Sequence, residues 1–154
     1  MEKWLIGVIS DTHGLLRPEA YAALEGSDLI IHAGDVGTPE VLEELKNIAS
    51  VVAVRGNVDR GSWANVLPIT KVIEIGEVLI YLLHNIDELD IVPEAAGLRL
   101  IINGHSHRPK HTAQNGVHYL NPGSAGPRRF DLPVTVARME IYGKEIDVEI
   151  IELL

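Results

Sequence analysis

Short apolar segments rich in valine and isoleucine alternate with helix-like segments through the first half of this sequence. The apolar segments are Trp4–Ile9, Asp28–His32 and Val51–Val54. Each is nearly continuous in hydrophobicity, as expected of strands that are buried on both faces. Between them, Pro18 begins a helix that continues over Glu19–Glu25, and Thr38 caps a helix with Pro39 at its first position. This β-α-β-α-β order predicts a parallel sheet.

The pattern changes after Pro68, where apolar segments joined by tight turns predict antiparallel strands. Ile69–Ile75 and Val78–Leu83 flank Gly76-Glu77, which is typical of a two-residue hairpin turn. The remaining predicted elements are a short, proline-interrupted helix over Asp87–Ala96 and strands over Arg99–Ile102, Lys110–Gln114, Val117–Leu120, Pro133–Ile141 and Lys144–Ile151. A parallel first half and an antiparallel second half favour two sheets packed face to face with helices outside.

Composition restricts the class of protein. The length of 154 residues is near the usual size of one domain, so we expect a single domain over residues 1–154. A net charge of −9 argues against broad attraction to nucleic acids or anionic membranes. The absence of cysteine excludes thiol redox chemistry and thiolate metal sites. No apolar segment approaches the roughly 20 residues of a membrane helix, and we expect a soluble, cytoplasmic protein.

Five short motifs of metal-ligand residues follow the strand-like segments in order. They are Asp11-Thr12-His13, Gly34-Asp35, Gly56-Asn57, His84 and Gly104-His105-Ser106-His107. Carboxylate, amide and imidazole groups bind divalent cations, and seven such groups are more than one ion uses. Any one motif alone is typical of an ordinary turn. Together, at strand ends where α/β proteins form ligand sites, they predict a two-metal site at one shared mouth.

Local geometry suggests how these side chains could converge. Asp11 and His13 are two positions apart, so an extended strand end would point both side chains the same way, and the same holds for His105 and His107. A glycine precedes three of the ligand positions, at Gly34, Gly56 and Gly104. We expect each glycine to let the backbone turn sharply and aim the next side chain inward.

The motif series resembles the signature of the calcineurin-like metallophosphoesterase superfamily over residues 11–107. Asn121-Pro122-Gly123-Ser124, followed by Pro127-Arg128, is similar to a segment of the compact YfcE-type phosphodiesterases. The resemblance implies an α/β fold, a four-layer α/β/β/α sandwich of two mixed sheets flanked by helices. It also implies a dinuclear centre of two divalent ions, with Mn²⁺ expected and Fe, Zn, Ni or Mg as alternatives.

The resemblance also implies a role for each ligand residue. One ion would be bound by Asp11, His13 and His107, the other by Asn57, His84 and His105, and Asp35 would bridge the two. Asp35, Asn57 and His84 would serve catalysis, in which hydroxide held between the ions attacks phosphorus in line. Because ligation needs neutral imidazoles, activity should fall below about pH 6.

Two departures from the family pattern affect the expected chemistry. Val58 stands where the wider superfamily has a histidine that assists the leaving group, so aryl phosphodiesters are the expected substrates. Asn85 stands where a glycine is usual, which leaves the aim of His84 open. Arg55 and Asp59 could equally orient ligands or form a surface ion pair.

Several further residues have two interpretations. Arg128 and Ser124 are candidates for holding substrate phosphate, although adjacent arginines such as Arg128 and Arg129 are more often solvated. Three other histidines, His32, His111 and His118, are interpreted as packed or exposed rather than as ligands.

We therefore expect a metal-dependent phosphoesterase that hydrolyses small phosphodiesters. The alternative is a catalytically weak or inactive protein-binding scaffold, like the eukaryotic retromer subunit of this fold. Residues able to bind metal at all seven ligand positions favour the enzyme, whereas Val58 leaves the scaffold alternative open. The expected partner is a small phosphoester, with no membrane or nucleic-acid partner, and a homo-oligomer is left open.

Overall fold

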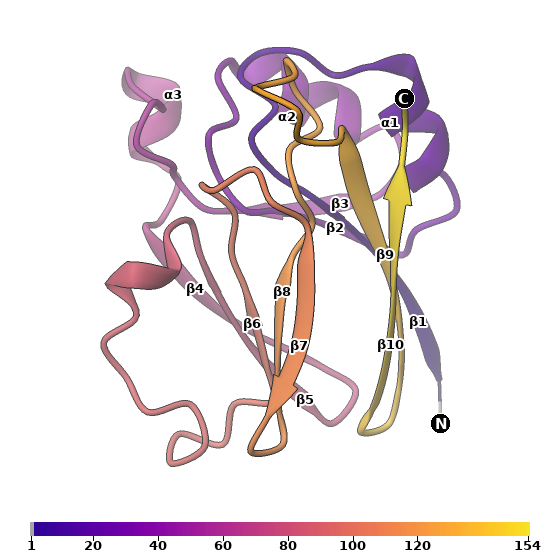
Figure 1. The fold of residues 1–154 in the computed structure, drawn as a ribbon, viewed down its shortest axis with the longest axis vertical. Coiled ribbons are helices and arrows are strands. Elements are labelled where there is room, and N and C mark those ends of the chain that lie inside the picture. Colours follow the sequence, from indigo (N-terminus) through magenta and orange to yellow (C-terminus); the bar gives the residue numbers. More distant parts are fainter. Residues whose placement is uncertain (1) are drawn as a thin grey trace.

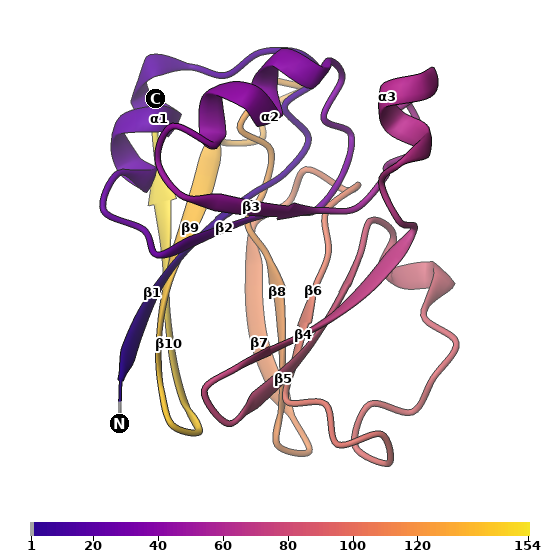
Figure 2. The same ribbon diagram turned by 180° about the vertical axis from the view of Figure 1, so that it is seen from behind.

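Two five-stranded mixed sheets face each other in the computed structural model (Figures 1 and 2). The strand order is β10-β9-β1-β2-β3 in the first sheet and β4-β5-β6-β8-β7 in the second. The structure describes residues 2–154; Met1, with which the predicted domain begins, lies outside the described residues. The predicted pair of facing sheets is confirmed.

The first sheet joins the predicted parallel strands to the C-terminal hairpin. Its strands are β1 (Lys3–Ile9), β2 (Leu29–His32), β3 (Ser50–Ala53), β9 (Thr135–Tyr142) and β10 (Glu145–Glu152). β1, β2 and β3 are parallel, while β9 is antiparallel to both β1 and β10. The predicted β-α-β-α-β order is thus confirmed, and the chain's last strands complete the sheet beside its first.

Two helices cover the outer face of the first sheet. They are α1 (Pro18–Leu24) and α2 (Pro39–Leu45). Leu24 of α1 and Val41 and Leu45 of α2 are buried in one cluster with apolar residues of the strands. Thr38 has the extended backbone of an N-cap, as predicted, but its side chain makes no capping hydrogen bond. Burial of these apolar side chains therefore holds the helices in place.

The second sheet is more parallel than the sequence predicted. Its strands are β4 (Thr70–Ile75), β5 (Val78–Leu83), β6 (Leu100–Ile102), β7 (Lys110–Gln114) and β8 (Val117–Asn121). The hairpins β4–β5 and β7–β8 are antiparallel, but β5, β6 and β8 run parallel. Parallel neighbours need a long crossover, which the segment between Leu83 and Leu100 supplies. The expected antiparallel second half is correct only for the hairpins.

The predicted helix over Asp87–Ala96 is wrong. The segment contains only the 3₁₀ turn η1 (Ile86–Glu88) and irregular chain after it. Pro93 disfavours helical backbone at Val92, so a regular helix is not favoured through the second half of this segment. Conversely, α3 (Ser62–Asn65) was not predicted, because four residues are too few to show a helical period. η1 and its following loop cover the outer face of the second sheet where a helical layer was expected.

The main core lies between the sheets. Ile6, Val8 and Ile31 of the first sheet share one buried cluster with Ile80 and Leu82 of the second. Ile9 instead belongs to the cluster beneath the helices, so β1 is buried on both faces. Full burial of each such side chain contributes roughly 1.5–3 kcal/mol. This packing fixes the two sheets relative to each other, and with them the loops that follow β1, β2, β5 and β6.

Candidate metal centre

The loops after four strands converge at one place. Asp11 follows β1, Asp35 follows β2, His84 follows β5 and His105 follows β6. Asp11 N donates to Gly34 O (3.0 Å) and His13 N to Asp35 O (3.0 Å), which joins the first two loops. His105 N donates to Asp11 Oδ2 (3.0 Å), which joins the two sheets. Hydrogen bonds from backbone N–H groups therefore hold the strand ends together at one mouth, as predicted.

Asp11 Oδ1 lies at the centre of the histidine cluster. It is 3.3 Å from His107 Nε2 and 3.9 Å from the Nε2 atoms of both His13 and His84. The candidate ligands form two groups, Asp11–His13–His107 and Asp35–His84–His105, in each of which the ligand atoms lie within 4.8 Å of one another. These groups match the two sets implied by the family resemblance, apart from Asn57.

Asp35 lies between the two groups. Its Oδ2 is 3.2 Å from His84 Nε2 and 3.7 Å from His13 Nε2, and its Oδ1 accepts from Val58 N (3.0 Å). Burial alone would raise the pKa of Asp35, but the contacts with His84 and Val58 outweigh it and lower the pKa to about 2. Asp35 is therefore ionised at neutral pH, as a bridging carboxylate must be.

The pKa values of the two histidines beside Asp35 are shifted in opposite directions. Burial acts to lower the pKa of His84, but the neighbouring Asp35 and Asp11 carboxylates outweigh it and raise the pKa. Burial also lowers the pKa of His13, and there the same two carboxylates offset only part of the effect. Without a cation, His84 holds its proton to higher pH than His13 does.

The donor atoms fit divalent cations because the protein leaves them unpartnered. Asp11 Oδ1, His13 Nε2, His84 Nε2 and His107 Nδ1 are buried without a hydrogen-bond partner among residues 2–154. Buried polar atoms in folded proteins are nearly always satisfied. Two divalent ions would satisfy this arrangement, because unpartnered carboxylate oxygens and imidazole nitrogens are the atoms that such ions bind.

In two of these ligands, His84 and Asp11, the opposite side-chain atom is held by the protein. His84 Nδ1 lies 2.7 Å from Ala33 O, to which it donates, so Nε2 faces the site as an acceptor. Asp11 Oδ2 accepts from Ser10 Oγ (2.6 Å), which leaves Oδ1 free. Asn85 has extended backbone and accepts from Asp87 N through its side chain. The family's glycine is therefore not required there, and the contact with Ala33 sets the aim of His84.

Left-handed backbone directs most of the ligand side chains. Positive φ angles occur at Asp11 (54°), His13 (47°), Asp35 (56°), His105 (72°) and His107 (62°). The expectation that both Asp-x-His and His-x-His converge on extended strand ends is therefore wrong. Such backbone costs roughly 1–2 kcal/mol per residue when the side chain is not glycine. The site thus contains conformational strain at five of its seven candidate ligands.

The motif glycines act mainly by allowing close approach. Gly34 has φ of 102° and so makes the predicted sharp turn. Gly56 and Gly104 do not have positive φ, but a Cβ on Gly56 would lie 2.2 Å from Asp35 N, and one on Gly104 would lie 2.1 Å from Ser10 Oγ. The predicted sharp turns are nevertheless present, because Asp59 N donates to Gly56 O (3.3 Å) and Ser106 N donates to Gly104 O (2.8 Å). The role of these two glycines is to let the loops touch.

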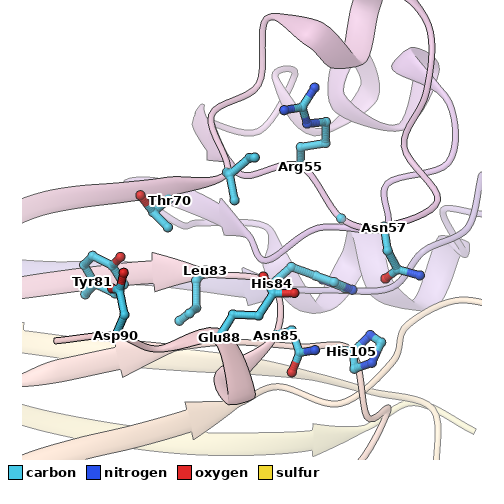
Figure 3. Close-up of a pocket in the computed structure, with 12 residues that line it drawn as sticks. Arg55, Asn57, Thr70, Tyr81, Leu83, His84, Asn85, Glu88, Asp90 and His105 are labelled. Atoms are coloured by element: carbon cyan, nitrogen blue, oxygen red, sulfur yellow. The ribbon is translucent and has the colours of Figure 1, made fainter.

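Asn57 lies at the mouth of the centre. It is exposed, and with His84 and His105 it lines a cleft of about 440 Å³ (Figure 3). Figure 3 shows the Asn57 side chain extending from the loop after β3 toward the ring of His84. The family resemblance assigns Asn57 to the same ion as His84 and His105. Its role as a ligand stays a prediction.

Two buried residues support the loops that carry the candidate ligands: His32, whose supporting role was missed from the sequence, and Asp59, whose role was left open. His32 is fully buried; its Nδ1 accepts from Gly34 N (3.1 Å), so Nε2 carries the proton and donates to Thr12 Oγ1 (3.0 Å). Burial lowers the pKa of His32 to about 4, which keeps it neutral. The interpretation of His32 as a packed histidine agrees with this position, but its apolar sequence context gave no signal of the hydrogen bonds.

Asp59 is the second supporting residue. Its carboxylate accepts from Val36 N (3.2 Å), Gly37 N (2.9 Å) and Gly56 N (2.8 Å) and is buried. It therefore ties the loop after β2 to the loop after β3, as an orienting residue does. Arg55 instead donates to Asn65 Oδ1 (3.3 Å).

Asn121 and Ser124 of the C-terminal motif support the loops that carry Asp11 and His105. Asn121 Nδ2 donates to Gly104 O (2.9 Å) and Ser106 Oγ (3.1 Å). Ser124 is buried and its hydroxyl donates to Asp11 O (3.0 Å), so the geometry gives Ser124 a structural role in place of the predicted phosphate contact. Arg128 is exposed.

The remaining predicted residues lie at the rim or elsewhere. Arg129 is exposed. His111 and His118 hydrogen-bond to each other (2.9 Å) with stacked rings and belong to neither group of candidate ligands.

Comparisons with known proteins agree with this geometry. The model of the calcineurin-like phosphoesterase superfamily domain matches residues 4–144. A protein of Methanothermobacter thermautotrophicus described as a "probable metallophosphoesterase" is 37% identical over 160 residues, covering 96% of this chain and 91% of its own length. The chain therefore belongs to the calcineurin-like phosphoesterase superfamily.

Solved structures show the same fold. An archaeal phosphodiesterase has a TM-score of 0.79 and 23% identity, covering 96% of this chain and 99% of that one. Vps29 from Entamoeba histolytica, complexed with zinc, has a TM-score of 0.76 and 22% identity, covering 97% and 99%. Identities this low establish the fold alone. Among the helices within residues 2–154, none has the length and apolar character needed to cross a membrane.

Proposed function

We propose that this chain is a metal-dependent phosphodiesterase that hydrolyses small phosphodiesters. The observation that carries the proposal is the cluster of buried, unpartnered donors of Asp11, His13, His84 and His107 around an ionised Asp35. The likeness to an archaeal phosphodiesterase supports diesters as the substrate class. Two manganese ions and a cytoplasmic location form part of the proposal.

Divalent ions bound here would activate water and neutralise charge on the phosphoryl group. The residues of the chain supply the arrangement. Asp35 Oδ2 lies beside one histidine of each group, His13 and His84. The Ala33 carbonyl holds His84 in the tautomer whose Nε2 faces the site. Asn57, at the mouth, presents an amide that can donate to a phosphoryl oxygen.

The leaving group receives no proton from residue 58. Val58 is partly exposed beside the site and has no titratable group. A leaving group that departs as a stable anion does not need a proton, whereas an alkoxide does. We therefore propose faster turnover of aryl than of simple alkyl phosphodiesters.

The proposal is tested with metal-stripped protein and a panel of aryl phosphomonoesters and phosphodiesters, with and without Mn²⁺. Diester hydrolysis should require Mn²⁺, and Asp35→Asn should lower kcat/KM by more than about a hundredfold, because a ligand shared by both groups loses its charge. Asp87→Asn, an exposed carboxylate outside the site, is the matched control. Equal turnover by the parent and Asp35→Asn would remove Asp35 from the mechanism.

A second candidate function is a protein-binding scaffold. Its specific support is the pair of exposed apolar residues Val66 and Val72, of which Val72 lies on β4, the edge strand of the second sheet. The likeness to Vps29 points the same way. Metal binding without turnover of any diester in the panel would favour this scaffold.

A further inference from the structure

The cleft beside the candidate metal centre is large enough for a small organic group. Its volume is about 440 Å³, and His84 and His105 are among the residues that line it (Figure 3). The His84 side chain is 7% exposed, and its Nε2 has no hydrogen-bond partner among the described residues. Because His84 belongs to both the cleft and the metal centre, a group bound in the cleft would adjoin a phosphoryl group at the centre.

Carboxylates supply the charge that faces this cleft. Glu88 of η1 and Asp90 just after it both line the cleft and are exposed. Arg55 is the one arginine or lysine among the described lining residues. Figure 3 shows its guanidinium pointing away from the other lining side chains, in keeping with the hydrogen bond from Nη1 to Asn65 Oδ1 of α3. The cleft therefore presents negatively charged hydrogen-bond acceptors.

The rest of the cleft is neutral and partly apolar. Ile69, Leu83 and the ring of Tyr81 line it and can pack against a carbon skeleton. Asn85 also lines it, and its Oδ1 is held by Asp87 N, so the side-chain amide has a fixed position. Such walls suit a small polar alcohol better than a second anion.

We propose that this cleft binds one ester group of the phosphodiester substrate, and that this group carries hydroxyl or ammonium donors and no second phosphate. The inference rests on the proposed function and narrows its substrate class to diesters of polyols or amino alcohols. Glu88 and Asp90 accept hydrogen bonds from the donors of the ester group. The same two carboxylates repel a second anionic group at their end of the cleft, because Arg55 is the one arginine or lysine among the described lining residues.

The test uses four p-nitrophenyl phosphodiesters that share one leaving group. The second ester group is glyceryl, 2-aminoethyl, ethyl or 2-phosphoethyl, and kcat/KM is measured with the Mn²⁺-loaded protein. We expect the glyceryl and aminoethyl diesters to exceed the ethyl diester, and the phosphoethyl diester to fall below it, by about tenfold each. The glyceryl and aminoethyl compounds distinguish hydroxyl from ammonium donors.

Glu88→Gln with Asp90→Asn should reduce these ratios to within about threefold of the ethyl diester, because charge is lost while shape is kept. Asp87→Asn with Glu94→Gln removes the same charge from the same segment but outside the cleft, and should keep the parent ratios. Ratios that stay unchanged in the Glu88/Asp90 variant would overturn the inference.

Binding without turnover separates this inference from the proposed function. Calorimetric titration of the Mn²⁺-loaded protein with the diethyl, diglyceryl and bis(2-aminoethyl) phosphodiesters measures the preference directly. No nitrophenolate release, together with a preference that the Glu88/Asp90 variant abolishes, would refute hydrolysis and support the subsite. Equal affinity for all three diesters would overturn the subsite even if hydrolysis is observed.

Discussion

Gly104 shows how closely the residues of the metal centre approach one another. A Cβ at this position would lie 2.1 Å from Ser10 Oγ and 2.7 Å from Asp11 Oδ2. These are the two atoms whose hydrogen bond turns the free oxygen of Asp11 toward the histidines. The absence of a side chain at residue 104 therefore determines where the Asp11 carboxylate can be.

Gly104→Ala should weaken Mn²⁺ binding by at least about tenfold and lower the free energy of unfolding by roughly 1–3 kcal/mol, because the new methyl group displaces Ser10 and Asp11. Calorimetry with Mn²⁺ and chemical denaturation measure the two effects. Gly97→Ala is the control: its Cβ would meet nothing within 4 Å, so it should lose stability through its φ of 76° but keep its Mn²⁺ affinity. Unchanged Mn²⁺ affinity in Gly104→Ala would contradict the packing argument.

Among the structural elements, the short loops after β2 and β3 depend on one carboxylate. Asp59 accepts three backbone N–H groups, from Val36, Gly37 and Gly56. Its removal would leave these donors without a partner in a buried setting, which costs roughly 1–3 kcal/mol per group. Asp59 thus positions Asp35 and Asn57 relative to each other without lying among the metal ligands.

Asp59→Asn should destabilise the protein by about 2 kcal/mol and weaken Mn²⁺ binding by about 10- to 100-fold, as expected for a residue that orients ligands. Thermal unfolding without metal and Mn²⁺ titration test the two effects separately. Asp28→Asn is a useful comparison, because Asp28 accepts from Leu5 N at the opposite end of β1 and β2. That variant should lose stability while its metal affinity stays unchanged, and equal metal affinity in both variants would refute the role of Asp59.

How far sequence predicts these elements depends on whether the signal is local. The β4–β5 hairpin was predictable because Gly76-Glu77 interrupts a period of two, and the ligand motifs because each ends an apolar segment. The left-handed backbone of Asp11 and the hydrogen bond between His32 and Thr12 involve contacts between loops that are distant in the sequence. No single segment encodes such contacts, so they appear only in the folded chain.

At the scale of the whole molecule, metal binding and folding should be coupled. The candidate ligands come from both sheets and are joined by the contact of His105 N with Asp11 Oδ2. Unfolding separates the sheets and destroys both groups of ligands. Ions that bind the folded state alone add to its stability by mass action.

Adding Mn²⁺ at about a hundred times its Kd should raise Tm by roughly 5–10 °C per occupied site at pH 8, and EDTA should reverse the rise. The rise should shrink as the pH falls toward 6. The raised pKa of His84 makes its protonated form the stable one in the metal-free protein at acid pH, so protons compete with the cation. Differential scanning calorimetry at several pH values tests this, and a Tm rise independent of pH would contradict it.

The position of β9 beside β1 has a consequence for synthesis on the ribosome. β1 is translated well before β9, the neighbour to which it is paired through Leu5 and Glu140. Until then the nascent chain carries an open edge of an apolar strand, a template for unwanted association. Asn121 and Ser124, which hydrogen-bond to Gly104 O and Asp11 O, are also translated after all the candidate ligands. The complete metal centre can therefore form only after that segment has been translated.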